Sequence, residues 1–348
     1  MIGPSAPVQT RLRPPAVGSD WLVRPRLLQA LRTALRHHQV VLVSAPAGYG
    51  KTTLLASLAA SNDFPVAWLS IDEEDNDPAN FVRGLIGALK RIDPDYGGTV
   101  QPLLGMAPPE AGPPDPRAGI RRLIGALIND LADVGEAPVV IILDDVHVLS
   151  EATVFVGLDY LLERLPAPMR LVVATRHDPP LSLARRRARG QLAEIRLEDL
   201  RFTSEEAIAL LRAGWHVALS PDELRTLNAR TEGWPAGLRL LASSLQAIEG
   251  AGDRRALLGG LPAAGEAYVF DFLAEEVLAR LDPRLRVFLE ETSILAELTA
   301  SVCQAVTGQP DADELLRELE RLNLFIIRTG TGSFRYHDLF KHFLHQRF

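Results

Sequence analysis

The residues best suited to chemistry in this chain are a lysine and two threonines that follow a glycine-bearing loop. Residues 44–53 read SAPAGYGKTT and stand between the apolar run 40–43 and an apolar segment that begins at Leu54. The run predicts a short buried strand and the segment predicts a helix. A glycine loop between a strand and a helix is where backbone N–H groups and a helix N-terminus surround a polyphosphate. The stretch therefore predicts a phosphate-binding P-loop.

Each part of this loop has an expected role. Lys51 would reach the β- and γ-phosphates, and the Thr52 hydroxyl would complete the shell of a magnesium ion. The strict pattern opens with glycine, whereas this loop opens with Ala45, which is acceptable if its backbone keeps a negative φ. The residues expected to hold the nucleotide here are Ala47, Gly48, Tyr49, Gly50, Lys51, Thr52 and Thr53.

Lysine usage supports this interpretation over an ordinary glycine turn. The chain has 37 lysines and arginines, of which only Lys51, Lys90 and Lys341 are lysines. Arginine therefore serves almost everywhere that a positive charge suffices, and the compact ammonium of Lys51 indicates a specific need.

Two acids end a buried strand later in the chain. Residues 139–143 read VVIIL and precede Asp144 and Asp145. In P-loop ATPases the first such acid holds magnesium through water, and a second can orient or deprotonate the attacking water. Asp144 is thus assigned to the metal and Asp145 to the water, with a capped turn as the alternative. His147 is expected to be a loop residue.

Other charged groups follow neighbouring strands. Arg176 comes after the strand 171–175 and would touch the γ-phosphate. Residues 72–77 carry five carboxylates, which would order magnesium-bound water or an arginine, or form a solvated loop with one capping residue. The arginines in 185–189 are expected on a solvated helix face.

The elements that position these residues predict an α/β fold. Five strands with intervening helices indicate a doubly wound parallel sheet at 20–200, after a flexible tail at 1–19. Residues 201–262 form a helical domain with a linker, placed at 249–265. Helices followed by a glycine hairpin predict a winged-helix domain at 263–348. Before the P-loop strand, the backbone of Val23 and Arg24 would hold adenine, or the helix that follows would simply pack.

Composition limits the function classes. The 348 residues are 47% hydrophobic and 23% charged, typical of a globular chain of two or three domains, with neither a membrane-spanning run nor a secretory signal. A single cysteine fits a reducing cytoplasm. The net charge of -7 argues against a general nucleic-acid binder.

These motifs together resemble the N-terminal half of the large ATP-binding LuxR-type transcription regulators, the MalT-like group within the STAND-class NTPases. The resemblance covers residues 21–348. It rests on LVR at 22–24, the loop 44–53, WLSID at 68–72, NDP at 76–78, LDDVH at 143–147, Thr175-Arg176 and EGWPAGL at 232–238.

The resemblance implies further site residues and partners. Arg176 would be the γ-phosphate sensor and Pro235 would lie against adenine. His337, in Tyr336-His337-Asp338, would contact the β-phosphate of ADP, or else would cap a helix. ATP or ADP with Mg²⁺ would be the ligands. An inducer would act through a sensor region, and DNA would bind a helix-turn-helix, both absent from this chain.

The function that this implies is an ATP/ADP-controlled switch with slow hydrolysis and self-association in the ATP state. The alternative is a continuously cycling ATPase that acts on a protein or nucleic-acid partner. It needs an arginine finger in trans, for which residues 185–189 are the candidate. A third possibility is a nucleotide-binding scaffold without hydrolysis, which the presence of both Asp144 and Asp145 disfavours.

Overall fold

The computed structural model describes residues 8–18, 21–104, 115–132, 138–214, 220–247 and 267–347. The expected linker at 249–265 lies outside these ranges. The chain forms two compact units. The first holds Met1–Val17, Val23–Ser44 and Lys51–Arg196, and the second holds Gly18–Leu22, Ala45–Gly50 and Leu197–Phe348. The central residues of the P-loop thus pack with the second unit.

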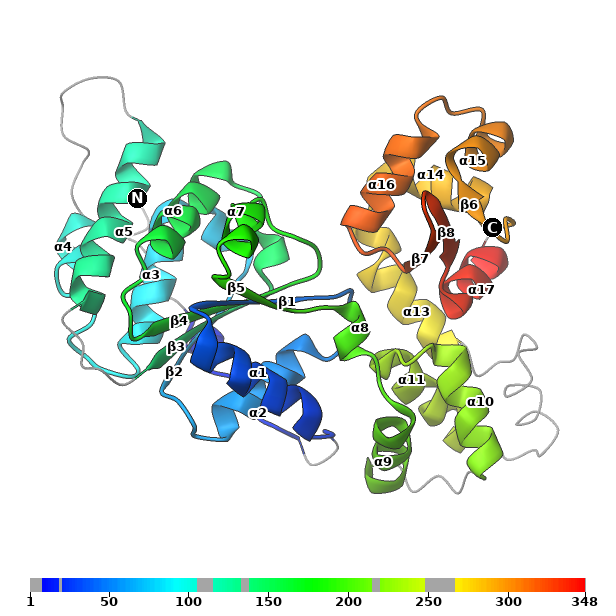
Figure 1. Ribbon diagram of the computed structural model, residues 1–348, viewed down its shortest axis with the longest axis horizontal. Coiled ribbons are helices and arrows are strands. Elements are labelled where there is room, and N and C mark those ends of the chain that lie inside the picture. The colour runs from blue at the N-terminus through cyan, green and yellow to red at the C-terminus, as the bar shows by residue number, and fades with distance from the viewer. Residues whose placement is uncertain are drawn as a thin grey trace. The chain divides into compact units, whose positions relative to one another are not determined.

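A five-stranded parallel sheet forms the centre of the first unit, in the order β2-β3-β4-β1-β5 (Figure 1). Its strands are β1 (Val40–Ser44), β2 (Val66–Ser70), β3 (Val139–Asp144), β4 (Met169–Thr175) and β5 (Leu192–Ile195). β1 and β3 are buried along their whole length, which explains their unbroken apolar sequences. The predicted doubly wound α/β sheet is confirmed.

Helices cover both faces of this sheet, with α1 and α2 on one side and α3, α5 and α6 on the other (Figure 1). The helices of the unit are α1 (Pro25–His37), α2 (Lys51–Ala60), α3 (Pro78–Leu89), α4 (Val100–Leu103), α5 (Pro116–Ala132), α6 (Ala152–Glu163) and α7 (Leu183–Ala188). Short 3-10 turns occur at Gln9–Leu12, Glu73–Asn76 and Val146–Val148. Asp77 caps α3 by accepting the N–H groups of Ala79 and Asn80, both at 2.9 Å.

Part of the expected N-terminal tail is packed against the sheet. Leu12 is buried in the core of the unit, and Arg11 Nε donates to the carbonyl of Ser70 at 3.0 Å. Arg11 also forms an ion pair with the buried Asp75 of the acidic loop. The acidic loop therefore orders an arginine, one of the roles expected for it.

Two neighbouring residues, Ser150 and Glu151, have different roles at the start of α6. The Glu151 carboxylate accepts the Thr153 N–H at 3.0 Å and is the N-cap. The Ser150 N–H and hydroxyl instead donate to Oδ1 of Asn76, at 2.7 and 3.2 Å. Ser150 is therefore hydrogen-bonded to the acidic loop and does not cap the helix.

The second unit is helical, with a small antiparallel sheet in the order β6-β8-β7. Its helices are α8 (Leu197–Leu200), α9 (Ser204–Gly214), α10 (Pro221–Thr231), α11 (Pro235–Ala247), α13 (Ala267–Glu276), α14 (Pro283–Thr292), α15 (Ala300–Thr307), α16 (Ala312–Arg321) and α17 (Asp338–Arg347), with a 3-10 turn at Leu278–Arg280. Its strands are β6 (Leu298–Thr299), β7 (Ile326–Gly330) and β8 (Ser333–Tyr336). Ser220 and Glu223 form a capping box at the start of α10.

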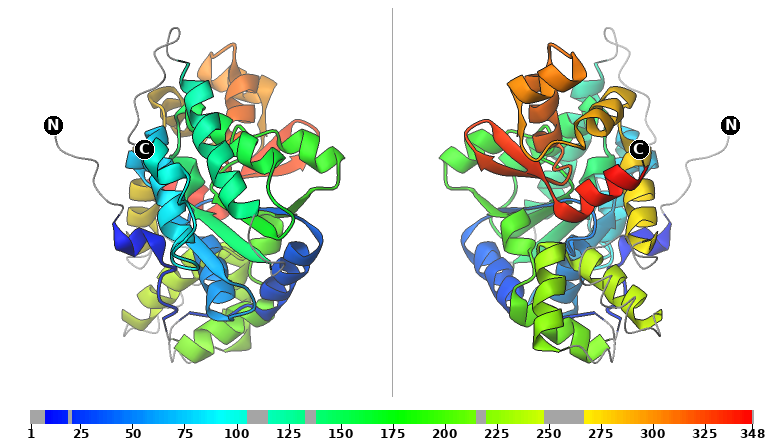
Figure 2. Two further views of the ribbon diagram at one scale, coloured as in Figure 1. Left: turned by 90° about the vertical axis from the view of Figure 1, so that its left-hand side faces the viewer. Right: turned by 90° about the vertical axis from the view of Figure 1, so that its right-hand side faces the viewer.

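The last part of the unit has the predicted helices and hairpin, and α17 follows directly after β8 (Figure 2). Two of its elements were not predicted, β6 and α15. β6 has only two residues, too few for an alternating pattern, and Thr299 starts α15 by accepting the Val302 N–H at 3.3 Å. Among the described residues, no helix combines the length and apolar character that a membrane span needs.

Candidate phosphate-binding site

The loop after β1 turns through two glycines. Gly48 and Gly50 both have φ of +78°, which L side chains rarely adopt. Ala45 is not among the residues with positive φ, so alanine in place of the first glycine is accommodated as predicted. α2 begins at Lys51, so the loop leads directly into a helix N-terminus.

Two cations approach each other at this N-terminus. Lys51 is buried, and burial lowers its pKa to about 8, with the neighbouring Arg176 cation acting in the same direction. Asp144 and Asp145 act against this shift. A polyphosphate between the two cations would relieve their repulsion and favour the charged form of Lys51. The arrangement therefore suits an anion with more than one negative charge.

A hydroxyl and a carboxylate meet beside Lys51. Thr52 Oγ1 donates to Asp144 Oδ2 at 2.8 Å. Burial raises the pKa of Asp144 to about 6, and the Asp145 carboxylate acts in the same direction. Oxygen donors of this kind fit Mg²⁺, which keeps several waters and shares its shell with substrate phosphates. Among the described residues, no group of three or more His, Cys, Asp or Glu side chains is placed to hold a metal ion by itself.

Asp145 has a different environment from Asp144. It adopts the left-handed conformation with φ of +59°, and its side chain is 45% exposed. Its Oδ1 lies 3.7 Å from His147 Nδ1, and the His147 ring stands edge-on to His177. Asp144 is thus enclosed next to Thr52, whereas Asp145 is open to water.

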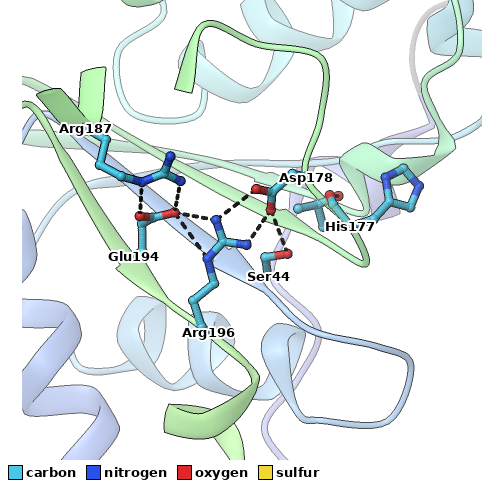
Figure 3. Close-up of polar contacts among 7 residues, drawn as sticks. Ser44, His177, Asp178, Arg187, Glu194 and Arg196 are labelled. Atoms are coloured by element: carbon cyan, nitrogen blue, oxygen red, sulfur yellow. Dashed lines mark hydrogen bonds and ion pairs between the residues drawn. The ribbon is translucent and has the colours of Figure 1, made fainter. Parts of the chain in front are cut away.

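The loop that carries Arg176 is fixed by polar contacts on both sides. Thr175 Oγ1 donates to the carbonyl of His177 at 2.7 Å. Asp178 accepts from Ser44 Oγ at 3.4 Å and from the guanidinium of Arg196 (Figure 3). Ser44 ends β1, so the loop after β4 is tied to the strand that enters the P-loop.

Arg196 also joins this loop to β5. Its guanidinium lies between Asp178 and Glu194, and Glu194 is shared with Arg187 at 2.8 Å (Figure 3). Hydrogen bonds lower the pKa of Glu194 to about 2, and those from Arg187 contribute more than those from Arg196. No sequence signal pointed to Arg196, because it follows its strand without a recognisable motif.

The arginines of α7 were expected on a solvated face, and this was wrong for one of them. Arg186 is buried, and its Nη1 donates to the carbonyl of Leu162 at 2.9 Å. Arg185 is bonded to Glu163 at 2.9 Å and stays exposed. The carbonyl that Arg186 reaches lies near the end of α6, a contact that periodicity does not reveal.

Val23 and Arg24, expected near adenine, lie at the start of α1. Arg24 is buried and is the N-cap, and its carbonyl accepts the Leu28 N–H at 3.0 Å. Val23 is exposed. Their contact with adenine stays a prediction.

Within the second unit, the P-loop is held by the turn before α11. Trp234 Nε1 donates to the carbonyl of Ala47 at 3.0 Å, and the Ala236 N–H donates to the carbonyl of Gly48 at 3.0 Å. Tyr49 is buried with its ring 6.5 Å from that of Phe325. Pro235 is the first residue of α11, and its place against adenine stays a prediction. The EGWPAGL motif marked this turn, but its contact with the loop was not predicted.

His337 lies in the same unit and is 1% exposed. Its Nε2 lies 2.9 Å from the carbonyl of Thr231, so Nε2 carries the proton. Its own carbonyl accepts the Lys341 N–H at 2.9 Å, which makes His337 the N-cap position of α17. The helix-cap alternative therefore holds for its backbone, and contact with a β-phosphate stays a prediction.

A charge pair adjoins His337. Glu232 accepts from both terminal nitrogens of Arg335, at 2.9 and 2.8 Å, and from the Asp338 N–H at 3.0 Å. Arg201 lies 3.9 Å from Glu232. The end of the hairpin is thus bonded to the turn that holds the P-loop.

Comparison with known proteins agrees with this architecture. Residues 18–174 match the AAA ATPase domain and residues 274–348 match the MalT winged helix domain. The chain is similar to the HTH-type transcriptional regulator MalT of Vibrio cholerae, at 32% identity over 345 residues, covering 98% of this chain and 37% of that protein. It is also 32% identical over 343 residues to the serine/threonine-protein kinase PknK of Mycobacterium tuberculosis, covering 97% of this chain and 30% of the kinase.

The chain spans about a third of the length of these curated relatives. Among solved structures, the Walker-type ATPase of Pyrococcus abyssi has a TM-score of 0.62 at 13% identity, covering 96% of this chain and 99% of that one. This likeness shows a shared fold.

Proposed function

We propose that the chain is an ATP/ADP-controlled switch. It is homologous to the MalT transcriptional regulators over nearly its whole length, and it joins an AAA ATPase domain to a MalT winged helix domain. It binds Mg-ATP, hydrolyses it slowly and uses the bound nucleotide to control self-association. The winged helix is not assigned to DNA, because α16, which precedes the hairpin, carries Asp313 and Glu314 in its first turn. Inducer and promoter recognition are assigned to other parts of a regulator.

The observation that supports the proposal best is the meeting of four groups at the start of α2. Lys51 and Thr52 begin the helix, Asp144 ends β3 and Arg176 follows β4. Ligands of open α/β sheets bind at the carboxyl ends of the strands, where these groups lie. Their charges suit a magnesium-bound polyphosphate.

Each group has a distinct role in phosphoryl transfer to water. Lys51 would hold the β- and γ-phosphates. Thr52 and Asp144 would hold a magnesium ion, which would neutralise phosphate charge when bound. Asp145, open to solvent, orients the attacking water. Arg176 reports the γ-phosphate, and the bonds of Asp178 to Ser44 and Arg196 fix its loop.

The contacts of α7 favour a switch over a continuously cycling ATPase. A cycling enzyme would present an arginine to a neighbouring copy, and the candidates were in 185–189. Three of the four candidates, Arg185, Arg186 and Arg187, instead bond within the unit, to Glu163, the Leu162 carbonyl and Glu194. These three side chains are therefore engaged within their own unit.

The test is equilibrium binding of ADP and ATP, with and without Mg²⁺, to the wild-type chain and to Lys51→Ala. The variant should lose binding at least tenfold. Lys90→Ala is the matched control, because Lys90 is bonded to Gln101 away from the loop, and it should bind as the wild type does. Unchanged binding in Lys51→Ala would overturn the proposal.

Two further measurements separate the alternatives. Asp145→Asn should retain nucleotide binding and lose turnover, whereas a scaffold without hydrolysis would show no turnover in the wild type either. Size-exclusion chromatography with ATP or ADP should show larger assemblies with ATP. A size independent of the nucleotide would remove self-association from the proposal.

A further inference from the structure

Trp234, which precedes α11, and the first turn of α11 bind two consecutive carbonyls of the P-loop. The Trp234 indole N–H is bonded to the carbonyl of Ala47, and the Ala236 N–H to the carbonyl of Gly48, each at 3.0 Å. All of these residues belong to one compact unit. One donor is a side chain and the other is the backbone.

The indole occupies a space that two glycines leave open. A Cβ at Gly48 would lie 2.8 Å from Trp234 Nε1 and 2.5 Å from the Ala236 Cβ. A Cβ at Gly237 would lie 2.3 Å from the indole ring. Trp234 is fully buried, so its position is set by packing.

The two bonds determine where the loop amides point. In a trans peptide the C=O and the following N–H lie in one plane and point in opposite directions. Holding the carbonyls of Ala47 and Gly48 on the side of Trp234 therefore turns the N–H groups of Gly48 and Tyr49 to the other side. A phosphate-binding loop depends on such inward N–H groups.

We propose that Trp234 is a positioning residue that orients the phosphate-binding amides of the P-loop, and that the winged helix acts on nucleotide binding through it. This inference rests on the proposed nucleotide-binding function. It gives the EGWPAGL motif a role toward the phosphates in addition to the role expected for Pro235 toward adenine.

Residues of the winged helix hold Trp234 in place. The Phe325 ring stands edge-on to the indole with centroids 5.1 Å apart, and the His337 ring does the same at 6.1 Å. The turn is bonded to the same domain at two points. The Thr231 carbonyl accepts from His337 Nε2, and the Glu232 carboxylate accepts from Arg335. Displacing the hairpin would therefore release Trp234 and, with it, the loop carbonyls.

The test compares ADP with adenosine, which has no phosphate. Trp234→Phe keeps an aromatic ring and removes the N–H, so the affinity for ADP should fall about 3- to 10-fold while that for adenosine stays unchanged, both measured by competition against a fluorescent ADP analogue. Trp68→Phe is the matched control, because Trp68 is also a buried tryptophan and its Nε1 bonds to Ser70 Oγ at 2.9 Å. It should leave both affinities unchanged.

A second variant tests the route through the winged helix. Arg335 lies outside the P-loop. Arg335→Gln should lower the affinity for ADP, as Trp234→Phe does, and leave the affinity for adenosine unchanged. Equal losses for ADP and adenosine in Trp234→Phe would indicate a merely structural role and overturn the inference, as would an unchanged ADP affinity. Failure of the wild type to bind ADP would overturn the proposed function itself.

Discussion

The bond between Glu232 and Arg335 offers a quantitative test of how the winged helix is held to the turn before α11. Glu232 is 9% exposed and accepts two hydrogen bonds from Arg335, at 2.8 and 2.9 Å. Burial disfavours the charge of Glu232, but the bonds from Arg335 and from the Asp338 N–H outweigh it and lower the pKa of this carboxyl. The pair therefore stabilises the folded unit above the carboxyl's ordinary pKa, and that stability is lost as the pH falls through its lowered pKa.

The magnitude follows from geometry and burial. Hydrogen bonds to charged groups contribute about 1.5–3 kcal/mol when buried, whereas exposed ion pairs contribute about 0–1 kcal/mol. Arg335 is 36% exposed, which places the pair between these limits. A double-mutant cycle of Glu232→Gln and Arg335→Gln should give a coupling free energy of about 1–2 kcal/mol.

A second pair on the same hairpin serves as a control. Arg328 also makes two hydrogen bonds to a carboxylate, from Nε and Nη2 to the one oxygen Oε1 of Glu320, at 2.9 and 2.6 Å, but the two side chains are 56% and 38% exposed. Its coupling free energy should be about 0.5 kcal/mol or less.

Both cycles are measured by urea unfolding at pH 7, followed by tryptophan fluorescence. Equal coupling free energies for the two pairs would refute the reasoning that burial strengthens the bond between the hairpin and the turn.

Three further predictions concern the loop, the metal and pH. Gly48→Ala should weaken ADP binding more than Gly50→Ala does. Both glycines have φ of +78°, but only a Cβ at position 48 would meet other atoms, the nearest at 2.5 Å. Equal effects of the two substitutions in a binding titration would contradict this. Thr52→Val should remove the Mg²⁺-dependent part of ATP affinity and Thr52→Ser should keep it, because the hydroxyl bonded to Asp144 is the expected ligand. Burial lowers the pKa of His337, so below about pH 6.5 the unfolded chain binds a proton on this imidazole that the folded chain does not bind. The free energy of unfolding should therefore decrease as the pH drops below this value, by at most about 1.4 kcal/mol per pH unit. In His337→Gln that part of the slope, measured by urea unfolding at several pH values, should be absent.

Much of the fold follows from local sequence patterns. β1 and β3 are continuous apolar runs because both faces of the sheet are covered, and Asp77 with Pro78 marks the start of α3 by its side-chain chemistry. The P-loop was found because glycines, a lysine and a threonine follow a strand in fixed order. Such signals lie within about ten residues of the chain.

What could not be predicted depends on contacts between distant residues. The burial of Arg186 depends on the carbonyl of Leu162, and the place of Arg196 depends on Asp178. The bond from Trp234 to Ala47 joins residues 187 positions apart. Nothing in the composition of the EGWPAGL motif shows that its indole meets a P-loop carbonyl, because that contact exists only after both segments fold.

The most direct test of the central claim is to denature the purified wild-type protein and identify the released nucleotide by chromatography, alongside steady-state ATP turnover. The account predicts about one ADP or ATP per chain, slow turnover, and no nucleotide from Lys51→Ala. A wild-type protein that releases no nucleotide and turns ATP over steadily would contradict the switch and favour the cycling ATPase.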